Sequence, residues 1–185
     1  AEDYGFVRDF VGTVAEAGCR VFIAHARNAW LKGLSPKENR EVPPLRYEVV
    51  HRLKQDFPQL VIAINGGFTQ AAQVSAQLAV LDGVMVGREA YHNPFWLASW
   101  DHDFFGAAES GLTREAVEAR MVDYMEREAA AHGTPWHAVA RHMLGLYHGL
   151  PGARRWRKVW SDHRLKALPA REVMALAHQR QPQAA

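Results

Sequence analysis

Leu60-Val61-Ile62-Ala63-Ile64-Asn65-Gly66-Gly67 is the stretch that decides the fold of this chain. Its apolar run is rich in β-branched side chains and lacks polar alternation, which is typical of a strand covered on both faces. The two glycines permit a tight turn, and Thr69 is a good N-cap for a helix that carries Ala71, Val74 and Leu78. The stretch therefore predicts a buried strand, a glycine turn and a helix.

The same alternation of helix and strand continues on both sides. Residues 4–17 place apolar side chains at helical spacing and precede the apolar run at residues 21–24. A second helical pattern at residues 46–56 ends before Pro58, and a third strand is expected at residues 83–87. This order indicates an α/β protein with a parallel sheet, either a barrel or a doubly wound sheet.

Three strands do not close a barrel, so a barrel needs five further strands, either upstream or from another chain. The chain begins with Ala1 rather than Met, and its first residues lead directly into a helical pattern. We interpret this as a truncated start.

The pattern becomes helical from Leu112 onward. Thr113 is the expected N-cap of a helix whose buried stripe includes Met121, Tyr124 and Met125, and Gly133 ends it. Three more helices are expected at residues 136–147, 154–165 and 170–177.

Composition excludes several classes of protein. With 48% hydrophobic and 23% charged residues, the chain is neither disordered nor membrane-spanning, so we expect a cytoplasmic protein. Its one cysteine, Cys19, excludes an internal disulfide framework and precedes a strand, which favours a structural role. None of the ten histidines forms an HExxH motif, and we predict no metal site.

Basic residues are concentrated near the C-terminal end, although the formal net charge is only +2. Residues 141–166 contain one acid, Asp162, and seven basic residues: Arg141, Arg154, Arg155, Arg157, Lys158, Arg164 and Lys166. This segment is a candidate surface for a polyanion.

Polar groups and glycines follow all three predicted strands. The first strand leads into His25 and Arg27, the second into Asn65-Gly66-Gly67, and the third into Gly87-Arg88. Glycine turns expose backbone amides that can bind an anion, and an arginine completes such a phosphate site. The alternatives are that the glycines only form a tight turn, that Arg88 pairs with a surface acid, and that His25 is a satisfied core histidine.

A long polar loop follows the first strand. It combines Trp30 with Lys32, Lys37 and Arg40, a mixture that suits a polyanion lying across the strand ends. A solvated charged loop held by Trp30 is the alternative.

Several blocks of sequence, in order, resemble the A subfamily of bacterial tRNA-dihydrouridine synthases. They are residues 22–30 (FIAHARNAW), 33–45 (GLSPKENREVPPL), 63–67 (AINGG), 82–91 (DGVMVGREAY), 141–146 (RHMLGL) and 151–157 (PGARRWR). The resemblance implies the C-terminal part of a TIM (β/α)8 barrel, its last three strands at residues 1–105, followed by an all-α tRNA-binding domain at residues 106–185.

The resemblance also implies an activity: an oxidoreductase that reduces uridine at positions 20 and 20a of the tRNA D-loop, with FMN as cofactor and NADPH as reductant. Reduced flavin gives a hydride to one carbon of an extruded uracil, and a cysteine acid protonates the adjacent carbon. We expect that cysteine upstream of this chain, no catalytic residue within it, and no turnover by the isolated fragment. The full-length protein is expected to be a monomer with no membrane partner.

The resemblance assigns roles to particular residues of this chain. It implies that FMN is bound by His25, Asn65, Gly66, Gly67, Gly87 and Arg88. It implies that tRNA is bound by Arg27, Lys37, Arg40, Arg154 and Arg157. Two other classes remain as alternatives: a barrel enzyme for a small phosphorylated metabolite, and a non-catalytic RNA-binding remnant.

Overall fold

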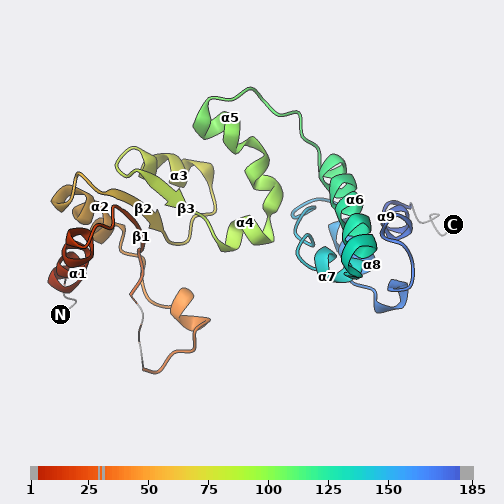
Figure 1. The fold of residues 1–185 in the computed structure, drawn as a ribbon, viewed down its shortest axis with the longest axis horizontal. Helices are drawn as coiled ribbons and strands as arrows, with labels where there is room; N and C mark the ends of the chain where they lie inside the picture. Colours follow the sequence, from red (N-terminus) through yellow and green to blue (C-terminus); the bar gives the residue numbers. More distant parts are fainter. Residues whose placement is uncertain (1–3, 29, 31, 180–185) are drawn as a thin grey trace. The chain divides into compact units, whose positions relative to one another are not determined.

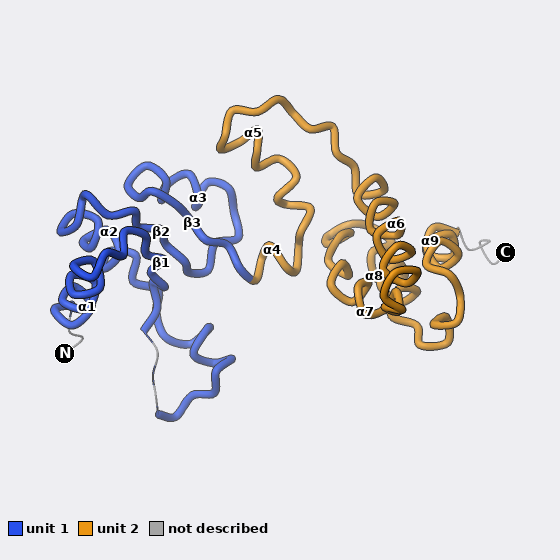
Figure 2. The backbone as a smooth tube through the Cα atoms, viewed as in Figure 1, with its two compact units in different colours: residues 1–87 blue, residues 88–185 orange. Residues whose placement is uncertain are grey.

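A computed structural model describes residues 4–28, 30 and 32–179 of the chain. Its contacts divide the chain into two compact units, residues 1–87 and residues 88–185 (Figure 2). This division falls earlier than the predicted boundary after residue 105, which concerned the end of a barrel domain and stays a prediction. Within the described ranges, every helix is too short or too polar to cross a lipid bilayer.

The first unit contains a three-stranded parallel sheet. Its strands are β1 (Val21–His25), β2 (Val61–Asn65) and β3 (Gly83–Met85), in the order β1-β2-β3 (Figure 1). The register places His25 opposite Asn65, and Asn65 opposite Met85. The predicted α/β architecture and parallel sheet are therefore confirmed, and the carboxyl ends of all three strands lie at one edge.

Three helices accompany the sheet: α1 (Tyr4–Glu16), α2 (Tyr47–Asp56) and α3 (Ala71–Leu78). α2 packs against β2, and α3 packs against β3. The side chains of Ile62 and Ile64 are buried beneath them, as the β-branched run predicts. The N-cap of α3 is Gln70 rather than the predicted Thr69. Gln70 has an extended backbone and forms a capping box with Gln73, whose side chain accepts from the Gln70 amide at 3.1 Å.

The opposite face of the sheet is largely exposed within the described residues of the first unit. Val21 and Ile23 of β1 are 60% and 61% exposed, whereas a strand covered on both faces was predicted. The cause is the alternation of side chains along a strand: these two residues point away from the helices. His25 and Asn65 belong to the same face, at its carboxyl end.

The second unit contains only helices and turns among its described residues. They are α4 (Arg88–His92), η2 (Pro94–Ser99), α5 (Trp100–Phe105), α6 (Arg114–His132), α7 (Trp136–Ala140), α8 (Ala153–Trp160), η3 (His163–Leu165) and α9 (Ala170–His178). α6 begins and ends as predicted: the Thr113 hydroxyl accepts from the Ala116 amide, and Gly133 takes the left-handed conformation at φ 67°.

Two predicted helices are shorter than expected. The helix expected at residues 136–147 ends at Ala140, and the amides of Met143 and Leu146 then donate to carbonyls only three residues back. In this irregular segment Gly145 lies directly against the backbone carbonyl of His92, where no side chain fits. The helix expected at residues 154–165 ends at Trp160 and is followed by the separate turn η3.

A buried carboxylate lies at the centre of the second unit. Glu118 of α6 is 0% exposed, and its oxygens accept hydrogen bonds from four side chains. Trp156 and Trp160 donate to Oε1 at 2.8 and 2.9 Å, and Tyr147 and His178 lie 3.1 and 2.6 Å from Oε2. Burial, and then the nearby Glu118 carboxylate, raise the pKa of the Tyr147 hydroxyl.

The predicted buried stripe of α6 is confirmed at Met125 and wrong at Tyr124. Glu118, Val122 and Met125 are buried, whereas Tyr124, expected inside, is 40% exposed. The polar Glu118 belongs to the buried side because its carboxylate is fully hydrogen-bonded there.

Candidate functional site at the carboxyl edge of the sheet

The parallel sheet brings together the polar residues that follow its strands. Asn65 is the cross-strand partner of both His25 and Met85, so the turn after β2 lies between the ends of β1 and β3. Gly66 and Gly67 directly follow β2, and Gly87 lies two residues beyond β3. Five of the predicted flavin-binding residues thus lie at one edge of the first unit.

His25 is exposed, and one side of its imidazole is fixed by the neighbouring strand. Its Nδ1 lies 3.1 Å from the carbonyl oxygen of Asn65, which also accepts from the Ala26 amide at 2.7 Å. A carbonyl oxygen only accepts, so Nδ1 must carry the proton. In the neutral imidazole, Nε2 is then a hydrogen-bond acceptor, available to a group outside the chain.

The turn at Gly66 and Gly67 needs glycine at both positions. Their φ angles are +155° and +71°, and a Cβ on either residue would lie less than 3 Å from a methyl group of Leu45. Tyr47 lies against the same turn. Its ring stacks on Phe68, with 5.3 Å between the ring centroids, and its hydroxyl donates to the Gly66 carbonyl at 2.5 Å. Burial raises the pKa of this hydroxyl, which therefore remains a donor at neutral pH.

The amides of this turn belong to a buried residue, Gly66, and an exposed one, Gly67. Among the hydrogen bonds of the described residues, none uses the backbone N–H of Gly66 or Gly67 as donor. Since the carbonyl and the following amide of a trans peptide point in opposite directions, the Tyr47 contact also directs the Gly67 N–H away from Tyr47. Two unpaired amides beside an exposed imidazole can bind an anion.

Gly87 differs from the paired glycines in its surroundings. A Cβ built on it would meet nothing within 4 Å, so neither packing nor a left-handed backbone explains a glycine here. Arg88 follows directly and begins α4, the first helix of the second unit.

Arg27 has partners within its own loop. One guanidinium nitrogen donates to the carbonyls of Glu41 and Pro43, and the backbone of Arg27 forms an antiparallel bridge with Leu45. Its buried Nε has no hydrogen-bond partner within the described residues. Arg27 therefore closes the loop between β1 and α2, and its predicted contact with tRNA stays a prediction.

Arg40 is the last residue of the short helix η1 (Glu38–Arg40), and Lys37 directly precedes this helix. Both residues are exposed. The loop around them is ordered by Asn39, whose side chain exchanges two hydrogen bonds with the backbone of Trp30, at 2.7 and 2.9 Å. The Ser35 side chain, and then the Ser35 amide, which donates to Glu38 at 2.8 Å, lower the pKa of the Glu38 carboxyl.

In the second unit, α8 presents the other predicted tRNA ligands. Arg154 and Arg157 are exposed, while Trp156 and Trp160 turn inward to Glu118. The buried face of α8 thus fixes the orientation of its basic face.

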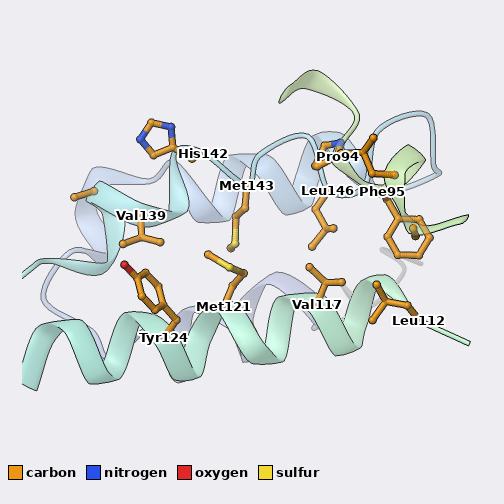
Figure 3. A pocket seen from close by; sticks show the side chains of 13 residues that line it. Pro94, Phe95, Leu112, Val117, Met121, Tyr124, Val139, His142, Met143 and Leu146 are labelled. Atoms are coloured by element: carbon orange, nitrogen blue, oxygen red, sulfur yellow. The ribbon is translucent and has the colours of Figure 1, made fainter. Parts of the chain in front are cut away.

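An apolar pocket of about 530 Å³ lies within the second unit. Figure 3 shows Val117, Met121 and Tyr124 of α6 facing Val139, Met143 and Leu146, with His142 at the rim. His142 accepts from the Arg141 guanidinium at 3.0 Å through Nε2 and contacts the Tyr91 hydroxyl at 2.9 Å through Nδ1. The sequence patterns did not indicate this pocket.

Among the residues that the structure describes, no three His, Cys, Asp or Glu side chains come together in a way that could hold a metal ion. Cys19 precedes β1, at the opposite edge of the sheet from His25, and its thiol contacts the carbonyl of Val21 at 3.4 Å.

These features define an α/β protein with a parallel sheet whose candidate anion site lies at the carboxyl edge. Residues 1–180 match the family model described as dihydrouridine synthase (Dus). The chain belongs to the dihydrouridine synthase family.

Curated relatives carry a more specific name, tRNA-dihydrouridine(20/20a) synthase. The protein from Shewanella oneidensis is 49% identical over 178 residues, which cover 96% of this chain and 53% of that protein. The protein from Escherichia coli K12 is 50% identical over 167 residues, which cover 90% of this chain and 48% of that protein. The protein from Synechocystis is 47% identical over 180 residues, which cover 97% of this chain and 54% of that protein. The chain spans about half the length of the curated relatives it matches.

Proposed function

We propose that this chain is part of a flavin-dependent tRNA-dihydrouridine synthase that reduces uridine at positions 20 and 20a of tRNA. Relatives about 50% identical that bear this name support the proposal most directly. The carboxyl edge of the sheet supports it independently, because unpaired amides and an exposed imidazole are suited to a phosphate-bearing cofactor.

The residues at this edge fit the phosphate end of FMN. The amides of Gly66 and Gly67 would donate to the phosphate oxygens, and the open space at Gly87 would admit the group closely. Arg88 would add positive charge, and Asn65 and His25 would offer side-chain hydrogen bonds. FMN, when bound, supplies the redox chemistry, taking electrons from NADPH and passing a hydride to uracil.

The exposed face of the sheet suits the interior of a barrel. Side chains of Val21, Ile23 and Val61 are exposed here although they are apolar, and interior positions of (β/α)8 barrels carry such branched residues. In this proposal β1, β2 and β3 are the last three barrel strands, and the helices after the barrel form a tRNA-binding domain.

The proposed RNA ligands are exposed basic residues of both units. Lys37 and Arg40 would meet tRNA from the loop after β1, and Arg154 and Arg157 from α8. Arg27 would act near them, since it holds the ends of the same loop together. The proposed location of such an enzyme is the cytoplasm, and its proposed state is a monomer.

Mapping of dihydrouridine by mass spectrometry in a bacterial strain that lacks its own 20/20a synthase tests the activity. Expression of the intact protein that contains this chain should restore dihydrouridine at positions 20 and 20a and leave other D-loop positions unchanged. Restoration at different positions, or none from a protein that is folded and carries flavin, would overturn the proposal.

A further inference from the structure

One buried carboxylate in the second unit joins four segments of the chain. Glu118 of α6 is 0% exposed, and its partners are Trp156 and Trp160 of α8, His178 of α9, and Tyr147 in the turns after α7. A buried charge loses its hydration, and apolar residues that fill the same space are often equally stabilising. Packing alone therefore does not explain an acid at this position.

The two oxygens of the Glu118 carboxylate have different partners. Oε2 accepts from the Tyr147 hydroxyl at 3.1 Å and lies 2.6 Å from Nε2 of His178. These two contacts fix the plane of the carboxylate. Oε1 accepts from the indole N–H groups of Trp156 and Trp160 at 2.8 and 2.9 Å. Because hydrogen bonds weaken steeply when they bend, the position of Oε1 determines the direction of both indoles.

The two indoles in turn determine the orientation of α8. Trp156 and Trp160 are four residues apart, so their side chains leave the helix on the same face. Among the described residues, Glu118 is the acceptor for both, and neither indole has another. Two donors one turn apart that converge on a single oxygen fix both the rotation of α8 about its axis and its position along that axis.

α8 depends on such contacts for its position. It has only 8 residues, and its N-cap, Gly152, forms no side-chain hydrogen bond with it. A helix this short is not stable alone, so packing against other segments holds it in place. The Arg155 guanidinium donates to the Leu176 carbonyl of α9 at 3.5 Å, which is long for a hydrogen bond. The short bonds to Glu118 are the stronger restraint on direction.

The side of α8 that faces away from Glu118 carries exposed cations. Arg154 and Lys158 are each two residues from Trp156, which places them roughly 200° around the helix from it. Both are exposed. A rotation of α8 about its axis would turn these cations through the same angle, so the hydrogen bonds on the buried side control where the charges point.

We propose that Glu118 is a positioning residue for tRNA binding: it orients the exposed face of α8 through the indoles of Trp156 and Trp160 and does not touch the RNA. The inference rests on the proposed function in naming tRNA as the partner. It goes beyond that function because it assigns a role to a buried acid, which a search for positive charge would not select. Phosphate contacts fix how a protein sits on RNA, so their direction matters as much as their number.

The affinity of the intact protein for tRNA tests this role. Trp156→Phe/Trp160→Phe keeps two aromatic rings but removes both N–H donors, so tRNA binding should weaken roughly fivefold or more. Each single variant should weaken it about twofold, which provides the test if the double variant does not fold. Glu118→Gln keeps an oxygen that accepts from both indoles, and its amide can donate to Tyr147 and His178. It should bind tRNA within about twofold of wild type.

Val122→Ala is the matched control for stability. Val122 lies on the same helix and is 0% exposed, so this variant loses packing but no hydrogen bond to α8. At a temperature where all variants are folded, it should bind tRNA within about twofold of wild type. Wild-type affinity in the tryptophan double variant would overturn the proposal. Equal losses of affinity in Val122→Ala, or in Glu118→Gln, and in the double variant would overturn it as well.

A distance measurement without RNA separates this proposal from the proposed function. Spin labels at Lys158→Cys of α8 and Arg127→Cys of α6, with Cys19→Ser, report the position of α8 by electron paramagnetic resonance. The distance distribution should be about twice as wide in the tryptophan double variant as in wild type or Val122→Ala. An unchanged width would overturn the proposal. If the width changes as expected but the wild type binds no tRNA, the proposed function is wrong, and with it the tRNA role of Glu118.

Discussion

The hydroxyl of Tyr47 donates a 2.5 Å hydrogen bond to the carbonyl oxygen of Gly66. This contact links the first residue of α2 to the turn after β2, and Leu45 packs on the same turn from the end of the long loop. Leu45 and Tyr47, which follow the loop that carries Lys37 and Arg40, therefore both contact the candidate phosphate turn.

Replacing Tyr47 by Phe tests whether its hydroxyl orients the turn. The variant loses the hydrogen bond that orients the Gly66–Gly67 peptide, so FMN affinity should fall roughly 2- to 10-fold, the equivalent of about 0.5–1.5 kcal/mol. Fluorescence titration with FMN measures it. Tyr124→Phe is the control, since that residue is 40% exposed and its hydroxyl forms no hydrogen bond within the described residues. Equal FMN affinities of Tyr47→Phe and wild type would show that the Tyr47 hydroxyl does not orient the turn.

Gly67→Ala should destabilise the first unit. Its φ is +71°, and the new methyl group would lie 2.9 Å from Leu45, so we expect a loss of about 1–2 kcal/mol in the free energy of unfolding. Gly12→Ala within α1 is the matched control, because its Cβ would make ordinary contacts with Phe57 at 3.6 Å. That change should be neutral or stabilise by up to about 1 kcal/mol. Urea denaturation compares them, and an unaffected Gly67→Ala would refute the strain argument.

Glu118→Ala should be among the most damaging substitutions in the second unit. It leaves the indole N–H groups of Trp156 and Trp160 without their acceptor and opens a cavity, so a cost of about 3–5 kcal/mol is expected. Glu128→Ala on the same helix should stay within about 0.5 kcal/mol. Chemical denaturation followed by tryptophan fluorescence measures both; a small effect at Glu118 would mean that the network contributes little.

Asp82 should make the first unit sensitive to acid. It accepts from the Ile62 amide and pairs with Lys54, each at 2.8 Å, and these contacts lower the pKa of its carboxyl below the ordinary 3.8. Its stabilising effect is thus complete above pH 3.8 and is lost as the pH falls through the lower folded-state pKa. Asp82→Asn should be less stable than wild type at pH 7, and this difference should shrink below pH 4.

Denaturation curves between pH 2 and pH 7 give the comparison for Asp82. Asp103→Asn, an exposed residue of α5, should leave the pH dependence unchanged. A stability difference for Asp82→Asn that is constant across this range would exclude the carboxylate as its source.

The sequence predicted those parts of the fold that local patterns determine. The apolar run before Gly66, the cap at Thr113 and the stop at Gly133 each reflect one local rule, and the structure has all of them. The same rules predicted that His25, Asn65 and the glycines lie at one edge of the sheet, because the carboxyl ends of parallel strands lie at the same edge.

Features that depend on contacts between distant segments could not be predicted in this way. Gly145 has the backbone carbonyl of His92 directly against it, and nothing near Gly145 in the sequence indicates that contact. Glu118 is buried because Trp156, Trp160 and Tyr147 supply donors from far along the chain. The spacing of Glu118 with Val122 and Met125 is the one local signal that could have placed it inside.

The most direct test of the central claim is the flavin content of Gly87→Asp compared with that of Gly87→Asn in the intact protein. Both side chains start in open space, and the two differ in charge, so a phosphate beside Gly87 should be repelled by the aspartate alone. Visible absorption of the purified variants should show at least tenfold weaker flavin binding for Asp than for Asn, with equal thermal stability. Equal flavin binding by the two variants would contradict a phosphate at this edge of the sheet.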